Sequence, residues 1–429
     1  MPESSNAATT GFAGQLSVRL LGNAVRTFNA LGAALARLGV SPASLDEAEL
    51  LRTARRRTGL DDFGPAPLHT PLRMLLRGCN SEAGLNLLGR MSTRWDILRL
   101  LSNRLLLQRD WQRMPEIFSQ PVERPVFIMG LPRSGTTLLH SLMAQDPGLR
   151  YPSHWETMYP SPPPERDSYE RDARIAAVER QLQWFHRLAP DFRAIHLMNA
   201  RYPQECTEIT NHVFMSLRYD TVYDVPSYRA WLDRTGHREA YRFHRRMLQH
   251  LQWHCPPRRW VLKAPDHVFA LDDLLETYPD ACILMAHRDP LKVVPSVASM
   301  TTVLQRVFSD RVDPAQVART VGERWAEGAR RMVQKRQQDN TPRRYLDVHY
   351  LDLVRDPMAM IHRIYDHFEL PLSSAARQRM EAFLDRNPKG RHGRHRYSLR
   401  QFGLDPHEQR RQYREYLDYF RVESEEGSD

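Results

Sequence analysis

The most restrictive feature of the sequence is a glycine turn that joins a short apolar run to a helical pattern. The run, Val126-Phe127-Ile128-Met129, is typical of a buried strand, and apolar residues recur at helical spacing over 138–143. Between them lies Gly130-Leu131-Pro132-Arg133-Ser134-Gly135-Thr136-Thr137, with its two glycines five residues apart. Strand, turn and helix in this order form half of a βαβ unit. We therefore expect a parallel sheet built around this turn.

Three later apolar runs predict further strands of the same sheet. They lie at 260–262, 282–286 and 345–350, and helical patterns follow them at 268–275, 291–304 and after Pro357. Strands that alternate with helices are typical of a parallel sheet. The predicted fold class is α/β, a P-loop-like parallel β-sheet flanked by helices, with a helical N-terminal extension and a helical insertion.

The remaining patterns divide the chain into four predicted segments. Residues 1–10 are expected to be a disordered lead, and residues 11–115 a helical N-terminal extension. Residues 116–422 are expected to form the α/β domain, in which 151–255 is a mostly helical insertion. The acidic tail 423–429 is expected to be disordered.

Composition excludes several classes of protein. Apolar residues make up 41% and charged residues 26%, as in ordinary globular chains. No uncharged apolar run reaches the ~18 residues of a membrane-spanning helix, and the N-terminus lacks the order of a secretory signal. The four cysteines form no Cys-x-x-Cys pair, and the 18 histidines form no His-Glu-x-x-His motif. We expect a cytoplasmic protein without a disulfide framework or a metal site.

The chain carries a net charge of +10, from 61 Lys and Arg against 51 Asp and Glu. Arginine binds phosphate and sulfate bidentately, so both an anionic ligand and a solvated basic surface fit this excess. The charge is spread along the chain rather than gathered in one arm, and we expect no nucleic-acid partner. The apolar and basic stretch 11–40 fits either peripheral membrane contact or packing on the protein's own body. The oligomeric state stays open, a homodimer included.

The glycine turn has the make-up of an anion-binding loop, because backbone N–H groups at a helix start can wrap a phosphate. Its spacing matches the nucleoside-triphosphate loop G-x-x-x-x-G-K-[ST], but Thr136 stands at the lysine position. A loop without that lysine lacks its contact to the β- and γ-phosphates, which favours a nucleotide with fewer phosphates. The candidate binding residues are Pro132, Arg133, Ser134, Gly135, Thr136 and Thr137.

Two further segments contain candidate anion ligands. Arg288 follows the third predicted strand, and Ser296 lies eight residues later in the following helix. They fit one phosphate at the carboxyl edge of the sheet, whereas the alternative for Arg288 is a local salt bridge or turn. The stretch 389–395 fits either a basic loop that closes over an anion or a solvated loop. Its candidate ligands are Gly390, Arg391, Gly393 and Arg394.

These three elements together resemble the sulfotransferases that use 3′-phosphoadenylyl sulfate (PAPS), in particular the bacterial-type family with the tyrosylprotein-like members. The similarity runs from about residue 45 to residue 405. It implies that the glycine loop holds the 5′-phosphosulfate, that Arg288 and Ser296 hold the 3′-phosphate, and that the loop 389–395 covers it. It also implies sulfuryl transfer to a hydroxyl or amine acceptor.

Sulfuryl transfer requires cations at the leaving phosphate oxygen and a base for the acceptor proton. The resemblance favours Arg133 and Lys263 as the cations, while a strand-end lysine paired to Asp266 is the alternative for Lys263. It favours Glu156 as the base, although a surface glutamate needs no function. The alternative bases are Glu205, His154 and His196.

The acceptor is the least constrained partner. Aromatic residues of the insertion fit either an apolar acceptor pocket or plain core. Together with the stretch 11–40 they favour a small-molecule or lipid-like acceptor, such as a glycolipid or a phenol. Two rival functions remain, a non-catalytic nucleotide- or anion-binding protein and a kinase with a degenerate loop.

Overall fold

A computed structural model of the chain describes residues 27–32, 34, 38, 43–188, 198–387 and 398–425. Several predictions lie outside these residues and concern the lead 1–10, most of the stretch 11–40, His196 and the basic loop with Gly390, Arg391, Gly393 and Arg394. Of the predicted tail, residues 423–425 are described and lie against the protein.

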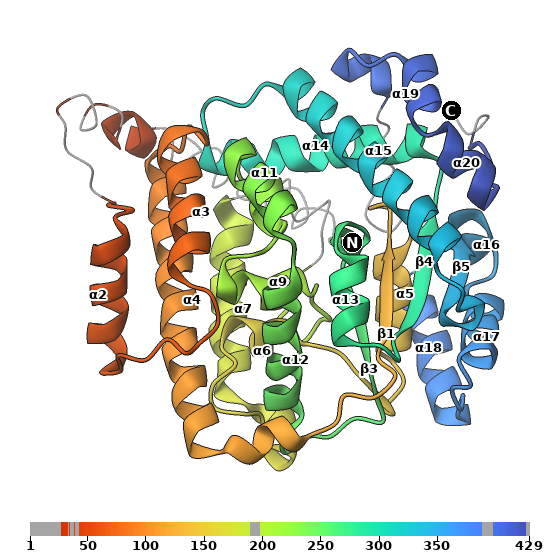
Figure 1. The fold of residues 1–429 in the computed structure, drawn as a ribbon, viewed down its shortest axis with the longest axis horizontal. Helices are drawn as coiled ribbons and strands as arrows, with labels where there is room; N and C mark the ends of the chain where they lie inside the picture. The colour runs from red at the N-terminus through yellow and green to blue at the C-terminus, as the bar shows by residue number, and fades with distance from the viewer. Residues whose placement is uncertain are drawn as a thin grey trace, which may run out of the picture.

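A five-stranded parallel sheet forms the centre of the α/β domain, in the order β2-β3-β1-β4-β5 (Figure 1). The strands are β1 (Val126–Gly130), β2 (Leu149–Arg150), β3 (Arg259–Lys263), β4 (Cys282–His287) and β5 (Tyr345–His349). The predicted fold class and all four predicted strands are confirmed. The edge strand β2 is additional, and its two residues are too few to form an apolar run.

Each central strand is buried on both faces, which explains its continuous apolar sequence. Val126 and Ile128 of β1 face a core that contains α5 (Thr136–Met143), α17 (Pro357–His367) and α18 (Ser374–Arg386). Phe127 and Met129 face the opposite way, into the largest core of the molecule. The alternation along β1 therefore joins two helical layers.

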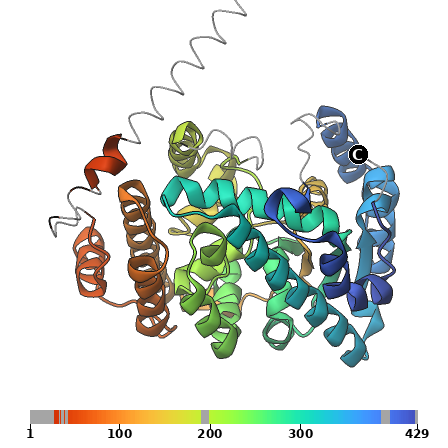
Figure 2. The ribbon, with the colours of Figure 1, turned by 90° about the horizontal axis from the view of Figure 1, so that it is seen from above.

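The N-terminal extension shares that largest core with the sheet. Its helices are α2 (Glu47–Thr58), α3 (His69–Ser81) and α4 (Leu87–Arg113), and they confirm the helical character expected between 43 and 115. Figures 1 and 2 place them at one end of the molecule, with the insertion between them and the sheet. The extension is thus continuous with the α/β domain in its hydrophobic core.

The insertion is helical, as predicted. Its helices are α6 (His154–Met158), α7 (Ala173–Leu188), α9 (Thr207–Thr210), α10 (Arg218–Val222), α11 (Pro226–Thr235) and α12 (Arg238–Gln252). The other helices after β3 are α13 (Leu271–Thr277), α14 (Pro290–Phe308), α15 (Pro314–Gln338), α16 (Tyr350–Arg355), α19 (Pro406–Gln412) and α20 (Arg414–Phe420). The helix predicted at 268–275 is divided into the 3-10 turn Pro265–Phe269 and α13. None of the helices in the described residues is long and apolar enough to span a membrane.

Gly130 ends β1 where the main chain of β4 leaves no room for a side chain. Its φ is 133°, and a Cβ atom added there would lie 2.1 Å from the carbonyl oxygen of Ala286. Only glycine fits this close approach, because the obstructing atom belongs to the backbone of the neighbouring strand.

We expect Gly130→Ala to lower the free energy of unfolding by about 3 kcal/mol, since the methyl group must push two strands apart. The matched control is Gly403→Ala. Gly403 also has a positive φ, of 71°, but a Cβ there meets nothing within 4 Å. The control should cost only about 1 kcal/mol of backbone strain. Urea denaturation of both variants measures the difference, and equal losses would contradict the steric explanation.

Candidate active site

Three chain segments meet at the carboxyl edge of the sheet. β1 ends at Gly130, β3 ends at Lys263, and Arg288 follows the end of β4. Because β3 and β4 are the parallel neighbours of β1 on its two sides, all three ends lie at one edge. An open parallel sheet binds ligands at such an edge, where the chain connections diverge to either side.

The glycine loop turns Arg133 outward and Ser134 inward. Arg133 is exposed and has a left-handed φ of 62°, and Gly135 has a φ of 88°. Ser134 is fully buried, and its Oγ donates a hydrogen bond to the carbonyl oxygen of Leu131 at 2.5 Å. The hydroxyl of Ser134 therefore holds the loop together. The first N–H groups of α5 lie beyond the reach of intrahelical bonds and remain suited to an anion.

A cavity of about 600 Å³ begins at this loop. Pro132, Arg133, Thr136 and Thr137 line one end of it. Apolar side chains from α4, α6, α7 and α14 line much of the remaining wall, and they are Leu88, Met91, Trp95, Met158, Phe185, Val297, Met300, Leu304 and Phe308. A polar, anion-binding end and an apolar body are thus parts of one cavity.

Four carboxylates line this cavity among the described residues, and three of them are paired with cations. The Oε1 atom of Glu205 accepts a hydrogen bond from the Nζ atom of Lys263 at 2.5 Å. Glu208 and Asp96 both lie 3.0 Å from nitrogen atoms of the Arg218 guanidinium. Lys263, predicted to act at the strand end, is therefore next to the cavity, and its partner is Glu205 instead of Asp266.

Asp266 is the fourth carboxylate, three residues beyond Lys263. It has no hydrogen bond or ion pair with another side chain in the described part of the chain. Burial raises the pKa of Asp266 to about 7, and the negative charge of Glu205 adds to that rise. Arg324 opposes the rise, and Asp220 supports it more weakly. This carboxyl group can therefore exchange a proton near neutral pH.

Glu156 lies outside the residues that line the cavity. It is fully buried, and its carboxylate forms an ion pair with Arg150. The other oxygen accepts hydrogen bonds from the backbone N–H of Ser153 at 2.8 Å and from the Tyr169 hydroxyl at 3.0 Å. Glu156 thus completes the capping box of α6. This position argues against its predicted role as the base.

Of the other predicted bases, Glu205 and His154 line the cavity. The Nδ1 atom of His154 lies 2.8 Å from the Nε2 atom of Gln204, so this nitrogen accepts a hydrogen bond from the amide. His196 lies outside the described residues. Strand-end position, which drew attention to Lys263, is also the signal that could have identified Asp266.

Arg288 lies at the end of β4, as predicted, but its guanidinium is paired with Glu425. Two of its nitrogen atoms donate to the two carboxylate oxygens, at 2.8 and 3.0 Å. Asp289 does not form the predicted local salt bridge, since its Oδ1 accepts from the backbone N–H of Leu291 and caps α14. Ser296 is half-buried on α14. No local sequence pattern predicts Glu425 as a partner of Arg288.

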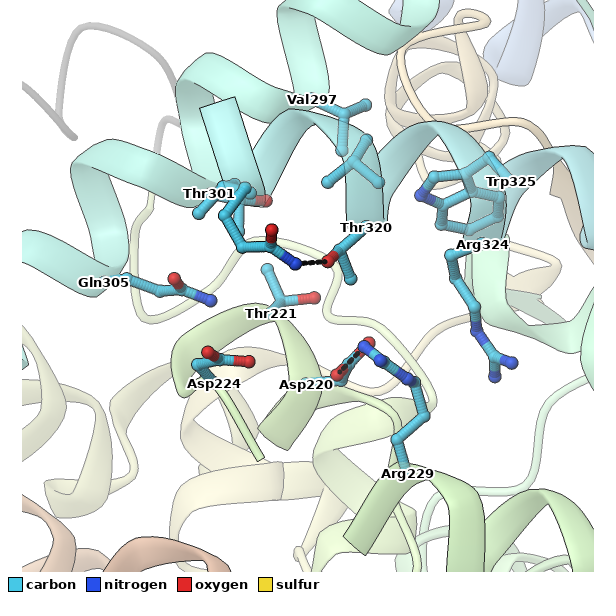
Figure 3. A pocket seen from close by; sticks show the side chains of 13 residues that line it. Asp220, Thr221, Asp224, Arg229, Val297, Thr301, Gln305, Thr320, Arg324 and Trp325 are labelled. Carbon is cyan, nitrogen blue, oxygen red and sulfur yellow. Dashed lines mark hydrogen bonds and ion pairs between the residues drawn. The ribbon is translucent and has the colours of Figure 1, made fainter. Parts of the chain in front are cut away.

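A second, much smaller pocket of about 60 Å³ lies between α10, α14 and α15. Figure 3 shows Asp220 paired with Arg229, at 2.8 Å, and Asp224 nearby. Burial raises the pKa of both aspartates. The pocket is too small for a nucleotide, and its carboxylates disfavour an anion.

Comparisons with known proteins agree on one family. The model of the sulfotransferase family matches residues 125–374. Omega-hydroxy-beta-dihydromenaquinone-9 sulfotransferase Stf3 of Mycobacterium bovis is 26% identical over 328 residues, which are 68% of this chain and 78% of that protein.

Two solved structures are similar over most of the chain. Sulfotransferase STF1 of Mycobacterium tuberculosis is 32% identical, with a TM-score of 0.76, over 86% of this chain and 98% of that one. Sulfotransferase STF9 of Mycobacterium avium is 28% identical, with a TM-score of 0.80, over 90% of this chain and 99% of that one.

We expect Glu156→Gln to lower the free energy of unfolding by about 3 kcal/mol, because it leaves the buried Arg150 guanidinium without its counter-charge. Glu170→Gln is the control, since Glu170 pairs with Arg201 at the surface and is 79% exposed. The control should change stability by less than about 1 kcal/mol. Denaturation of the two variants tests this, and a Glu156→Gln protein of wild-type stability would return Glu156 to the candidate bases.

Proposed function

The chain belongs to the sulfotransferase family, and we propose that it moves a sulfuryl group from PAPS to a hydroxyl group of a lipid-like acceptor. The supporting observation is the shape of the main cavity. Its polar end is the glycine loop without the triphosphate lysine, and its body is a largely apolar space of about 600 Å³. A charged donor and an apolar acceptor can therefore meet inside one cavity.

The donor end has the groups that a 3′,5′-phosphorylated adenosine requires. The N–H groups at the start of α5 suit the 5′-phosphate, and the helix dipole favours its negative charge. Arg133 is exposed within the loop and suits the sulfuryl group. Arg288 already binds a carboxylate bidentately, which supports its use for a 3′-phosphate of similar geometry.

The acceptor end favours an apolar molecule. Met91 and Trp95 line the cavity and are also 47% and 45% exposed, so an apolar surface continues from the cavity to the outside. The Stf3 relative is named for an omega-hydroxylated dihydromenaquinone, an apolar molecule with a hydroxyl group. We propose an acceptor of the same chemical class, with its hydroxyl group at the loop and its apolar chain along α4.

Peripheral membrane contact remains part of this proposal. The side chain of Asn29 accepts a hydrogen bond from the backbone N–H of Leu88 at 3.1 Å, and Leu88 lines the cavity. Phe28 and Leu31 on the same short segment are exposed. Apolar side chains beside the cavity support delivery of the acceptor from a lipid surface.

Three groups are assigned to the chemistry. Arg133 and Lys263 stabilise the negative charge on the leaving phosphate oxygen, and Glu205 positions Lys263 through their 2.5 Å contact. The bond between sulfur and the phosphate oxygen breaks while a bond between sulfur and the acceptor oxygen forms. The bonding electrons leave with the phosphate oxygen of 3′,5′-ADP.

Asp266 is proposed as the group that accepts the hydroxyl proton. The other three cavity carboxylates are neutralised by cations, whereas Asp266 has no cationic partner among the described residues. Its pKa of about 7 is close to the value at which a general base is most effective at neutral pH.

We expect Arg133→Ala to lower the rate of sulfuryl transfer by at least about 100-fold, because it removes a cation from the transition state. The measurement follows labelled sulfate from PAPS to primary alcohols of increasing chain length. Binding of 3′,5′-ADP should persist, since the loop amides remain. Arg124→Ala is the control, because Arg124 precedes β1 and pairs with the exposed Glu369 far from the loop.

Absence of transfer from wild-type protein to every alcohol, phenol and amine tested would sink the enzymatic proposal. Calorimetry with 3′,5′-ADP and with ATP and Mg²⁺ then separates the rivals. Preference for ATP and Mg²⁺ would support a kinase, and 3′,5′-ADP binding without transfer would support a nucleotide-binding protein.

We expect the wild-type transfer rate to rise with pH up to about 7, as Asp266 loses its proton, and to level above it. Asp266→Asn should be at least about tenfold slower, and its rate should lack this rise. Asp224→Asn is the control, since the pKa of Asp224 is also raised by burial but it lies outside the main cavity.

A stability measurement accompanies this test. A carboxyl group whose pKa is raised by folding destabilises the protein when ionised, and the penalty grows as pH rises from about 4 to about 7. Asp266→Asn should therefore gain stability relative to wild type over that range, by at most about 4 kcal/mol. An unchanged pH–rate profile in the stabilised variant would assign the base elsewhere, with Glu205 and His154 as the next candidates.

A further inference from the structure

Arg288 is held in place from three sides. Its Nε and Nη2 atoms donate to the two oxygens of Glu425, at 2.8 and 3.0 Å. Its Nη1 atom donates to the carbonyl oxygen of Arg133 at 2.7 Å, which ties it to the glycine loop. The guanidinium carbon lies 3.8 Å from the centre of the Tyr350 ring. The fork of the guanidinium is therefore fixed and filled by a carboxylate.

The segment that carries Glu425 is anchored on both sides of that contact. The backbone N–H of Glu425 donates to the Oδ2 atom of Asp289 at 3.0 Å, and the Oγ atom of Ser424 accepts from Arg410 at 3.0 Å. These contacts position the backbone on both sides of the Glu425 side chain. The carboxylate therefore meets Arg288 from a supported main chain.

The preceding helix α20 positions this segment over the end of β4. The ring of Phe420 stacks on His287 with 4.2 Å between ring centres. The hydroxyl of Tyr416 accepts from the backbone N–H of Arg288 at 3.4 Å. Figure 1 shows α19 and α20 at the side of the sheet that carries β4 and β5. After α20 the chain returns across the strand end, through Arg421 with its left-handed φ of 52°.

We propose that Glu425 is a displaceable internal counter-ligand of the nucleotide site. This inference rests on the proposed function, in which Arg288 binds the 3′-phosphate of PAPS. The Glu425 carboxylate occupies the same two donors of the guanidinium that a phosphate would take, so the two cannot bind them together. The 3′-phosphate displaces Glu425 when the donor binds, and Glu425 returns when 3′,5′-ADP leaves.

This exchange has a defined effect on binding. A phosphate monoester carries more negative charge than one carboxylate, so it can win the exchange, but the broken Glu425 contact reduces its net gain. PAPS and 3′,5′-ADP both carry the 3′-phosphate, and Glu425 weakens them by the same factor. It therefore keeps Arg288 correctly oriented in the free enzyme and speeds release of the product. A nucleotide without a 3′-phosphate has nothing to exchange with it.

The test compares Glu425→Gln with Glu423→Gln in the full-length protein. Both variants remove one negative charge from the same segment, but Glu423 is exposed and lies outside the Arg288 contact. Calorimetry measures the dissociation constants of 3′,5′-ADP and of 5′-AMP for each protein. We expect Glu425→Gln to bind 3′,5′-ADP about tenfold more tightly than wild type, which corresponds to about 1.4 kcal/mol.

The same experiment separates a failure of this inference from a failure of the proposed function. Glu423→Gln should match wild type for both nucleotides, and 5′-AMP should bind all three proteins equally. Equal or weaker binding of 3′,5′-ADP to Glu425→Gln would overturn the counter-ligand role and leave the sulfotransferase proposal intact. A parallel gain for 5′-AMP or in Glu423→Gln would also overturn it, as a general charge effect. Failure of 3′,5′-ADP to bind any of the proteins would overturn both proposals.

Steady-state kinetics supply an independent readout. Glu425→Gln should lower the KM for PAPS and the inhibition constant of 3′,5′-ADP together, while Glu423→Gln leaves both unchanged. Where product release limits turnover, kcat of Glu425→Gln should fall, because 3′,5′-ADP is held longer. A KM that rises in Glu425→Gln would instead make Glu425 a residue that orients Arg288 for the donor, and it would overturn the competition.

Discussion

The contact between the end of β1 and the main chain of β4 is the constraint on which the site depends. Gly130 lies against the carbonyl group of Ala286, and this close approach sets where the loop leaves the sheet. The register of β1 with β3 then brings Lys263 to the same edge. Cationic groups from three distant parts of the chain are thus assembled by backbone hydrogen bonds, before any side chain contributes.

Electrostatic pairing separates the roles of the acidic side chains around the cavity. Glu205 is bound to Lys263 and Glu208 to Arg218, so their charges are largely neutralised inside the protein. Asp266 lacks such a partner among the described residues, and burial makes its proton harder to remove. Similar carboxylates in one cavity therefore differ in chemistry because their neighbours differ.

The sheet and the glycine loop could be predicted because each has a strong local signal. Strands buried on both faces are apolar throughout, and the loop is defined by the spacing of two glycines. Glu156 was assigned to the chemistry, although Ser153 three residues earlier also fits a capping box, and the structure has that box. The pairing of Arg288 with Glu425 spans 137 residues, so no local pattern could predict it.

The N-terminal helices and the sheet are buried in one continuous core. α4 contributes at once to that core, through residues such as Leu100 and Leu101, and to the wall of the acceptor cavity, through Met91 and Trp95. Reshaping the wall to admit a bulkier molecule would therefore disturb the packing that holds the whole chain together. Acceptor choice and fold stability are inherited through the same helix, which limits how freely this enzyme could diversify toward new acceptors.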